Sequence, residues 1–281
     1  MSKFSKLLFT IAVGALVCWW YQQQQPGAQS GAFIAFLDVG QGDAIYIRTS
    51  SGADVLIDGG PGRAVLERLP EVMAPGDTTI ELMLLTHPDA DHITGLVETA
   101  KRYTVKQIVT TALPATKPLH EELWQLIETQ QIEHLVVAAG DHITLGPQDY
   151  VDILYPAADD PLATLETNDT SIIAEYHYQQ AGDDLAVLLT GDAGAYVEEQ
   201  LVSRQLLQDI DILKVGHHGS KTSSSQALLD AVQPELCVLS VGQDNQYGHP
   251  KPEILERLQP YCEIRRTDQE GNIIINLEID E

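Results

Sequence analysis

The densest group of reactive side chains in this chain is the run His87-Pro-Asp-Ala-Asp-His92, which holds four candidate metal ligands within six residues. Two imidazoles and two carboxylates would be costly to bury together without a cation. Imidazole and carboxylate ligands suit Zn²⁺, Mn²⁺ or iron. The run therefore predicts a divalent-metal site, and a solvated polar loop is the alternative.

Acidic and histidine side chains also follow three later strand-like runs. They are Asp192 after Leu185–Thr190, His217 and His218 after Ile212–Val215, and His249 after Leu236–Val241. Side chains that leave successive strands in this way are expected to meet at one edge of a sheet. We therefore expect them to join the first run in a single site. Asp192 also opens a helical pattern, so an N-cap role is the alternative for this carboxylate.

The elements that must position these residues alternate between β-rich runs and helical patterns. Strands are expected at Phe33–Asp38, Ala44–Arg48, Asp54–Ile57, Ile80–Thr86, Leu135–Ala138, Tyr150–Tyr155, Ser171–Tyr178, Leu185–Thr190, Ile212–Val215, Leu236–Val241 and Ile273–Ile279. Helices are expected from near Thr94 and at Pro118–Gln130, Ala195–Leu207, Gln226–Val232 and Pro252–Leu258. Interleaved strands and helices predict a layered α/β fold, in one domain that spans residues 31–281.

The first 30 residues have a different character. Lys3 and Lys6 precede the apolar run Leu7–Tyr21, and Gln22–Pro26 follow as a linker. This order is typical of a secretory signal peptide or a short signal anchor, although a membrane span needs roughly 20 residues. We expect the bulk of the chain to be extracytoplasmic, either periplasmic or secreted. It would be attached to the inner membrane through this segment wherever the segment stays uncleaved.

The charge of the chain limits its partners. Sixteen Lys and Arg face 41 Asp and Glu, for a net charge of −25. Such an acidic surface repels nucleic acids and anionic membranes at long range, so an anionic substrate would need the local positive charge of metal ions. Of the three cysteines, Cys18 lies in the apolar run. A disulfide between Cys237 and Cys262 is left open, because spacing does not define connectivity.

Seven segments, in this order along the chain, resemble the metallo-β-lactamase superfamily. The resemblance is greatest to the hydrolase domain of ComEC/Rec2-type competence proteins and their stand-alone relatives. The segments are Phe36–Ala44, Leu56–Gly60, Leu85–His92, Asn168–Ser171, Leu189–Asp192, Val215–Ser225 and Tyr247–Pro250. The resemblance implies an αββα four-layer sandwich with metal ions at one edge of its two sheets.

Carried over residue by residue, the resemblance implies two divalent ions, Zn²⁺ or Mn²⁺. The ligands are Asp91, His92 and His217 for one ion, His87 and Asp89 for the other, and Asp192 as a bridge. Most members of the family have histidine where Asp89 stands, and a more oxygen-rich site favours Mn²⁺ or weakly held Zn²⁺. Asn168 stands in a region where another histidine is common. Its two candidate roles are contact with metal or substrate and a turn residue.

The resemblance also implies hydrolysis by a hydroxide that the ions generate near neutral pH. The residues assigned to catalysis are Asp91, with His218 or His249 protonating the leaving group. The residues assigned to substrate are Asn168, Ser220, Lys221 and Thr222, with His249 also placed to bind phosphodiester oxygens. For Lys221 the alternative is a solvated loop lysine. Asp38, Asp43 and Asp58 are expected to hold turns or to orient ligands.

The favoured function is hydrolysis of a phosphodiester, either nucleic acid, as a ComEC-like nuclease acting on DNA, or a small or cell-envelope phosphodiester. One alternative is an ester or amide hydrolase that acts on a lactone or β-lactam. The other is a non-catalytic exported domain that binds a partner. The dense set of acid and histidine residues argues against the last.

Overall fold

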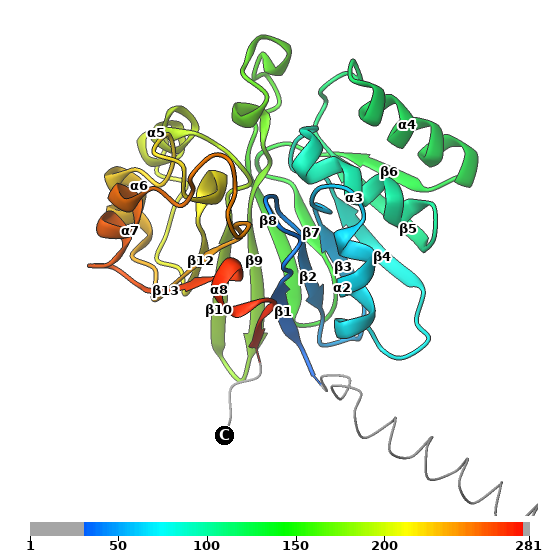
Figure 1. Cartoon of the computed structure of the whole chain (residues 1–281), viewed down its shortest axis with the longest axis horizontal. Coiled ribbons are helices and arrows are strands. Elements are labelled where there is room, and N and C mark those ends of the chain that lie inside the picture. Colours follow the sequence, from blue (N-terminus) through cyan, green and yellow to red (C-terminus); the bar gives the residue numbers. More distant parts are fainter. Residues whose placement is uncertain (1–30, 278–281) are drawn as a thin grey trace, which may run out of the picture.

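Two mixed β-sheets lie face to face at the centre of the molecule, and helices cover the outer face of each (Figure 1). The computed structural model describes residues 31–277. Within these residues each sheet has seven strands, in the orders β14-β1-β2-β3-β4-β5-β6 and β13-β12-β11-β10-β9-β8-β7. The predicted αββα sandwich is confirmed.

The first sheet is antiparallel at one end and parallel at the other. Its strands are β1 (Phe33–Phe36), β2 (Ile45–Arg48), β3 (Asp54–Ile57), β4 (Thr79–Leu84), β5 (Thr104–Thr110), β6 (Glu133–Val136) and β14 (Ile273–Asn276). Pairs among β14, β1, β2 and β3 are antiparallel, whereas β3 through β6 pair in parallel. Strand β14 pairs with β1 in the register Phe36↔Ile273, so the end of the described chain closes the sheet beside its beginning.

The second sheet is likewise antiparallel at one end and parallel at the other. Its strands are β7 (His142–Thr144), β8 (Asp149–Tyr155), β9 (Ile173–Gln180), β10 (Asp183–Leu189), β11 (Ile212–Lys214), β12 (Leu236–Leu239) and β13 (Glu263–Arg266). Strands β7 to β10 pair in antiparallel fashion, and β10 to β13 pair in parallel. Parallel neighbours need crossover connections, and these connections carry most of the helices.

Most of the helices lie on the two outer faces (Figure 1). The helices are α2 (Ala64–Val72), α3 (Ala90–Ala100), α4 (Pro118–Gln130), α5 (Ala195–Ser203), α6 (Gln226–Val232), α7 (Pro252–Leu258) and α8 (Thr267–Glu270). Short 3₁₀ turns lie at Leu162–Thr164, Asn168–Thr170 and Gly216–Gly219. Figure 1 shows α2, α3 and α4 outside the first sheet and α5, α6 and α7 outside the second.

Three apolar layers fill the spaces between these elements. The central layer joins inward-facing side chains of both sheets, such as Phe36 and Ile57 from the first and Tyr176 and Val187 from the second. One outer layer packs the first sheet against α2, α3 and α4, and the other packs the second sheet against α5, α6 and α7. Burial on both faces explains why the strands read as continuous apolar runs.

Most expected elements are present, with differences at their ends. The bounds of α4, α6 and α7 match the expected ranges. Helix α3 begins at Ala90 instead of near Thr94, which places Asp91 and His92 in its first turn. The expected set lacked the helices α2, whose sequence includes Pro70, and α8, and the short or polar strands β5, β7 and β13. Neighbouring strands and helices stabilise these segments where local pattern is weak.

None of the helices within residues 31–277 combines the length and apolar character needed to cross a membrane. The apolar run 7–21, on which the signal or anchor prediction rests, lies outside the described residues.

Candidate metal centre

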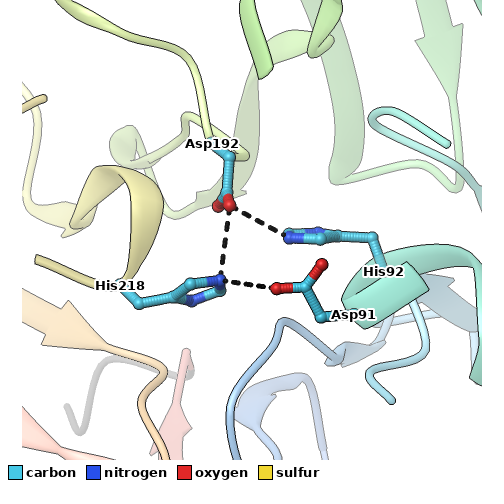
Figure 2. A group of neighbouring side chains, drawn as sticks. All are labelled: Asp91, His92, Asp192 and His218. Carbon is cyan, nitrogen blue, oxygen red and sulfur yellow. Dashed lines mark ion pairs between the residues drawn. The ribbon is translucent and has the colours of Figure 1, made fainter. Parts of the chain in front are cut away.

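Four side chains from both halves of the sandwich converge at one point (Figure 2). Asp91 and His92 come from the first turn of α3, Asp192 follows β10, and His218 lies in the turn after β11. The Nε2 atoms of His92 and His218 each lie 3.3 Å from Oδ2 of Asp192. His218 Nε2 lies 3.5 Å from Oδ2 of Asp91. One ligand atom from each of the four residues lies within 4.8 Å of the others.

A close backbone contact brings His92 into this group. The amide N–H of Gly59, just after β3, donates to the carbonyl oxygen of His92 at 2.8 Å. A Cβ atom at Gly95 would lie 1.7 Å from the carbonyl oxygen of Gly59, so only glycine allows this approach. As a result His92 Nδ1 donates to Oδ2 of Asp58 at 2.7 Å. Asp58 therefore orients His92, and its oxygens also accept from the N–H and hydroxyl of Thr86.

His218 is oriented by a different device. The backbone at His217 and His218 is left-handed, with φ angles of 48° and 54°. This conformation turns two successive imidazoles in different directions. His218 Nδ1 donates to the carbonyl oxygen of Ser240 at 2.9 Å. Its Nε2 atom is thereby left facing Asp91 and Asp192, which is the usual arrangement of a histidine that holds a metal.

His87 completes the group from the end of β4. Thr86 Oγ1 donates its hydrogen to Asp58, so it accepts from Nδ1 of His87 at 3.0 Å. This fixes Nε2 of His87 as the nitrogen with a free lone pair. The ring centroids of His87 and His92 lie 4.1 Å apart. Burial and neighbouring His92 lower the pKa of His87 to about 4, so that its imidazole is neutral near pH 7.

The buried polar atoms at this centre fit a cation. Among the described residues, Nε2 of His87, His92 and His218 and Oδ1 of Asp192 are all buried without a hydrogen-bond partner. Buried polar atoms are otherwise almost always paired in folded proteins. Three imidazoles that use Nδ1 as a donor and leave Nε2 free, beside two carboxylates, form a donor set that suits Zn²⁺ or Mn²⁺. The chain's own residues therefore fit the metal that the sequence predicts.

Strong local charges surround the centre. Burial opposes charge on His92, but the carboxylates of Asp192 and Asp58 outweigh it and raise the pKa of His92 well above its usual value. Burial is likewise outweighed at His218, whose pKa Asp192 raises. The same pairs lower the pKa of Asp192 despite its burial. Because a ligating imidazole must be deprotonated, binding of a metal cation here would release protons from these histidines.

Asp89 lies at the side of the centre, where the second ion was predicted. Its Oδ2 is 3.9 Å from Nε2 of His87. Its Oδ1 accepts from Nζ of Lys117, at the start of α4, at 2.5 Å. This ion pair was not foreseen from the sequence. It shows that Asp89 already has one cationic partner from the chain.

One predicted ligand differs from the observed geometry. His218, which the sequence analysis assigned to proton transfer, stands with Asp91, His92 and Asp192 in the place expected for His217. Nε2 of His217 is 3.9 Å from Oδ2 of Asp192. Its ring nitrogens lie 3.3 Å from Nδ2 of Asn168 and, at Nδ1, 3.3 Å from the hydroxyl of Thr222. The left-handed turn explains the exchange, because adjacent residues there face different surroundings.

An open cavity of about 540 Å³ lies beside the centre. Its walls include Asp89, Asp192, His217 and the predicted substrate residues Asn168 and Thr222. The predicted residues outside this wall are arranged as follows. Ser220 is buried and pairs with the hydroxyl of Thr222 at 2.9 Å, Lys221 is exposed, and the ring of His249 lies 5.8 Å from that of His217. Burial and the neighbouring histidines lower the pKa of His249 to about 4.

Lys214, to which the sequence analysis gave no role, is part of the charged surroundings of this centre. It ends β11 and its side chain is fully buried. Its ammonium pairs with Asp43, donates to the carbonyl oxygen of Gly191 at 3.0 Å, and lies 3.8 Å from Oδ1 of Asp192. Burial opposes charge on Asp43, yet Lys214 and His218 hold its pKa at about 2. A lysine inside an otherwise apolar strand was the available signal, since lysine is rarely buried without a partner.

The chain belongs to the metallo-beta-lactamase superfamily, because the model of that family matches residues 37–242. Among curated relatives, ComE operon protein 3 of Bacillus subtilis is 28% identical over 268 residues, 88% of this chain and 33% of that protein. Recombination protein 2 of Haemophilus influenzae is 33% identical over 247 residues, 85% of this chain and 28% of that protein. The chain thus spans a third or less of the length of these two relatives. The predicted ComEC/Rec2-like resemblance is confirmed.

Solved structures agree with the family's fold. Igni18, a metallo hydrolase from Ignicoccus hospitalis, aligns with a TM-score of 0.56 at 14% identity. The alignment covers 88% of this chain and 100% of that one. At this identity the similarity concerns the fold.

Replacing Lys214 with methionine is expected to lower the free energy of unfolding of the metal-free protein by about 3–5 kcal/mol, since Asp43 would remain buried without its partner. Urea unfolding in the presence of EDTA measures this change. Lys106→Met, at an exposed position of β5, is the matched control and should change stability by less than about 0.5 kcal/mol.

The double variant Asp43→Asn with Lys214→Met removes both charges and should recover part of the loss. Equal free energies of unfolding for K214M and K106M would show that the buried ion pair between Lys214 and Asp43 does not stabilise the protein.

Proposed function

We propose that this chain is a metal-dependent phosphodiesterase whose substrate is a nucleic-acid strand. The observation that carries the proposal is the convergence of Asp91, His92, Asp192 and His218, with buried unpaired nitrogen and oxygen atoms, beside an open cavity. Membership of a hydrolase superfamily supports metal-dependent hydrolysis. A relative named for recombination supports nucleic acid as the substrate class.

The proposed division of ligands follows the geometry. Asp91, His92, Asp192 and His218 would hold one divalent ion, Zn²⁺ or Mn²⁺. His87 and Asp89 would hold a second ion, with Asp192 as the proposed bridge. Bound divalent ions lower the pKa of water and stabilise charge on a phosphoryl oxygen. The ions would also offset the repulsion between a polyanion and a chain of net charge −25.

The chain's own residues would position the substrate. Nδ2 of Asn168 and the hydroxyl of Thr222 line the cavity and can donate to phosphoryl oxygens. The pKa of His249 is about 4, so its imidazole is neutral near pH 7. In that state it hydrogen-bonds to an oxygen of the leaving group instead of protonating it. His218 Nε2 lies 3.5 Å from Asp91 and 3.3 Å from Asp192, which supports a ligand role for His218 in this proposal.

Substitutions in the two adjacent histidines test the ligand assignment. His218→Gln and Asp192→Asn are expected to lose most bound metal and to lower phosphodiester hydrolysis by about a hundredfold or more, as for removal of a preorganised charge-stabilising group. His217→Gln should keep metal content close to that of the wild type and lower activity less, because its Nε2 lies farther from the carboxylate. Elemental analysis and hydrolysis of bis(p-nitrophenyl) phosphate after Mn²⁺ or Zn²⁺ loading measure both effects.

Four outcomes would contradict these assignments or the proposed activity. Loss of metal in H217Q but not in H218Q would restore the original ligand prediction. Full activity of D192N would refute the proposed centre. Hydrolysis of a lactone or β-lactam panel without any phosphodiester cleavage would favour the ester or amide alternative, and bound metal without any hydrolysis would favour a binding domain.

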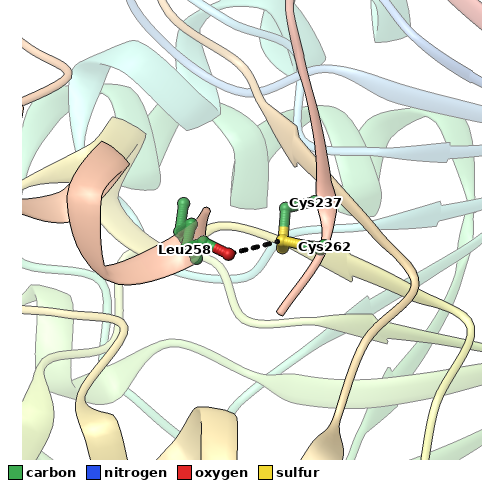
Figure 3. The surroundings of a disulfide bond; sticks show 3 residues. All are labelled: Cys237, Leu258 and Cys262. Carbon is green, nitrogen blue, oxygen red and sulfur yellow. Dashed lines mark hydrogen bonds between the residues drawn. A yellow bond between two sulfur atoms is a disulfide. The ribbon is translucent and has the colours of Figure 1, made fainter. Parts of the chain in front are cut away.

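We further propose that the chain acts outside the cytoplasm. A disulfide joins Cys237 in β12 to Cys262, which follows α7 (Figure 3). Cys237 is fully buried, and the sulfur of Cys262 lies 3.6 Å from the carbonyl oxygen of Leu258. Stable disulfides are rare in reducing compartments, so this bond supports export. The predicted signal peptide or anchor remains part of this proposal.

Replacing both cysteines with alanine is expected to lower the free energy of unfolding by about 3 kcal/mol, because the bond closes a loop between residues 25 positions apart. Urea unfolding with and without dithiothreitol measures this. Reduction should destabilise the wild type and leave the double variant unchanged. Cell fractionation with thiol alkylation completes the test: recovery from the cytosol with Cys237 and Cys262 both alkylated would contradict export.

A further inference from the structure

Two exposed tyrosines belong to the surroundings of the cavity: Tyr196 lines it, and Tyr247 is connected to its wall through the ring of His249. Among the described residues, the large apolar or aromatic side chains with high exposure are Val136, Tyr196, Leu206 and Tyr247. Tyr196 is 53% exposed and Tyr247 is 54% exposed. Tyr196, in the first turn of α5, lines the cavity together with Asn168 and His217. Exposed aromatic rings that gather at one site mark a binding surface more often than scattered ones.

Tyr247 belongs to a row of rings that leads toward the same cavity. Its ring stacks on that of His249, with centroids 5.9 Å apart and planes at 24°. The ring of His249 in turn lies 5.8 Å from that of His217, at the cavity wall. One face of Tyr247 is therefore supported by an imidazole. Its exposed area is available to a flat ligand ring.

The loop that carries Tyr247 is held in place. Nδ2 of Asn245 donates to the carbonyl oxygens of Gly242 and His249 at 2.9 and 2.7 Å. Oδ1 of Asn245 accepts from the N–H of His249 at 3.0 Å. Lys251 Nζ donates to the carbonyl oxygen of Tyr247 at 2.7 Å. A platform that is positioned before binding loses little entropy when a ligand stacks on it.

The charge of the chain makes such uncharged contacts important. Proteins that bind nucleic acid usually obtain most of their affinity from Lys and Arg contacts to phosphates. This chain has a net charge of −25, and Asp89, Glu166, Asp169 and Asp192 line the cavity. Stacking of bases on aromatic rings needs no positive charge and tolerates any base sequence. Stacking is thus the contact best suited to a nucleic acid at so acidic a site.

We propose that Tyr196 and Tyr247 are stacking platforms for unpaired bases on the two arms of a single-stranded nucleic acid whose phosphodiester enters the centre. This inference rests on the proposed phosphodiesterase function and adds that the site binds single-stranded nucleic acid in preference to a duplex. Bases in a duplex are already stacked on their neighbours, so both platforms favour a single strand or a frayed end. Neither tyrosine touches the metal ligands in this role; each sets the affinity for the strand.

The test compares strands with and without bases. The full chain is loaded with Mn²⁺, and hydrolysis is measured on an eight-residue oligothymidylate and on the same backbone built of abasic residues. Binding of both strands, labelled with fluorescein, is measured by anisotropy with Ca²⁺ in place of Mn²⁺, which keeps divalent cations at the site and provides a readout other than hydrolysis. The variants are Tyr196→Ala, Tyr247→Ala and Tyr196→Phe. Val136→Ala, at an equally exposed position of β6, is the matched control.

Each alanine variant is expected to weaken binding of the thymidylate strand by about fivefold to a hundredfold and to raise its KM with little change in kcat. Y196F should remain within about twofold of the wild type, because it keeps the ring. Neither alanine variant should affect the abasic strand more than V136A does.

The outcomes separate this inference from the proposed function. If strands are cleaved but Y196A and Y247A behave as V136A does, the stacking platforms are refuted and the phosphodiesterase remains. Cleavage of bis(p-nitrophenyl) phosphate without binding of any strand would also refute the platforms and leave the phosphodiesterase activity standing. Tyrosine-dependent binding of the base-bearing strand without cleavage of any phosphodiester would instead refute the proposed catalysis and support the platforms.

Discussion

Neutralisation of buried carboxylates is the constraint on which the arrangement of the site depends. Asp43, Asp58 and Asp192 are each 3% exposed or less, and they lie where the two sheets meet. An isolated charge in such a place would be severely destabilising. The chain surrounds these carboxylates with His92, His218 and other hydrogen-bond donors. Because burial makes their negative charge costly, the same carboxylates attract cations.

The fold meets this constraint by bringing donors from distant parts of the sequence to one edge. His92 reaches the centre because α3 packs on the glycine after β3. Lys214 reaches it from β11, in the other sheet, and pairs with Asp43 from the loop between β1 and β2. The two sheets therefore share charges as well as the apolar layer between them. A change in how the sheets pack would alter the metal donors directly.

The two sides of the centre differ in how much of their negative charge the protein's own cationic side chains neutralise. On one side, four side chains face one another: Asp91, His92, Asp192 and His218. Among the residues that the structure describes, the cationic side chains that contact this group are its own histidines and Lys214. Asp89, at the other side, already pairs with Lys117. The protein thus supplies its own cation beside Asp89. The negative charge left for a bound cation therefore differs between the two sides of the centre.

The sequence by itself determined the family, the layered fold and the main group of donors. The run from His87 to His92 and the residues at later strand ends are local features, because spacing decides which side chains leave each strand. The sequence could not show which of His217 and His218 faces the other donors, because the left-handed backbone of both residues sets where each imidazole points. Nor could it pair Lys214 with Asp43, place Tyr196 at the cavity wall, or connect Tyr247 to that wall through His249. These contacts join residues far apart in the chain, and only the packing of the two sheets and their loops brings them together.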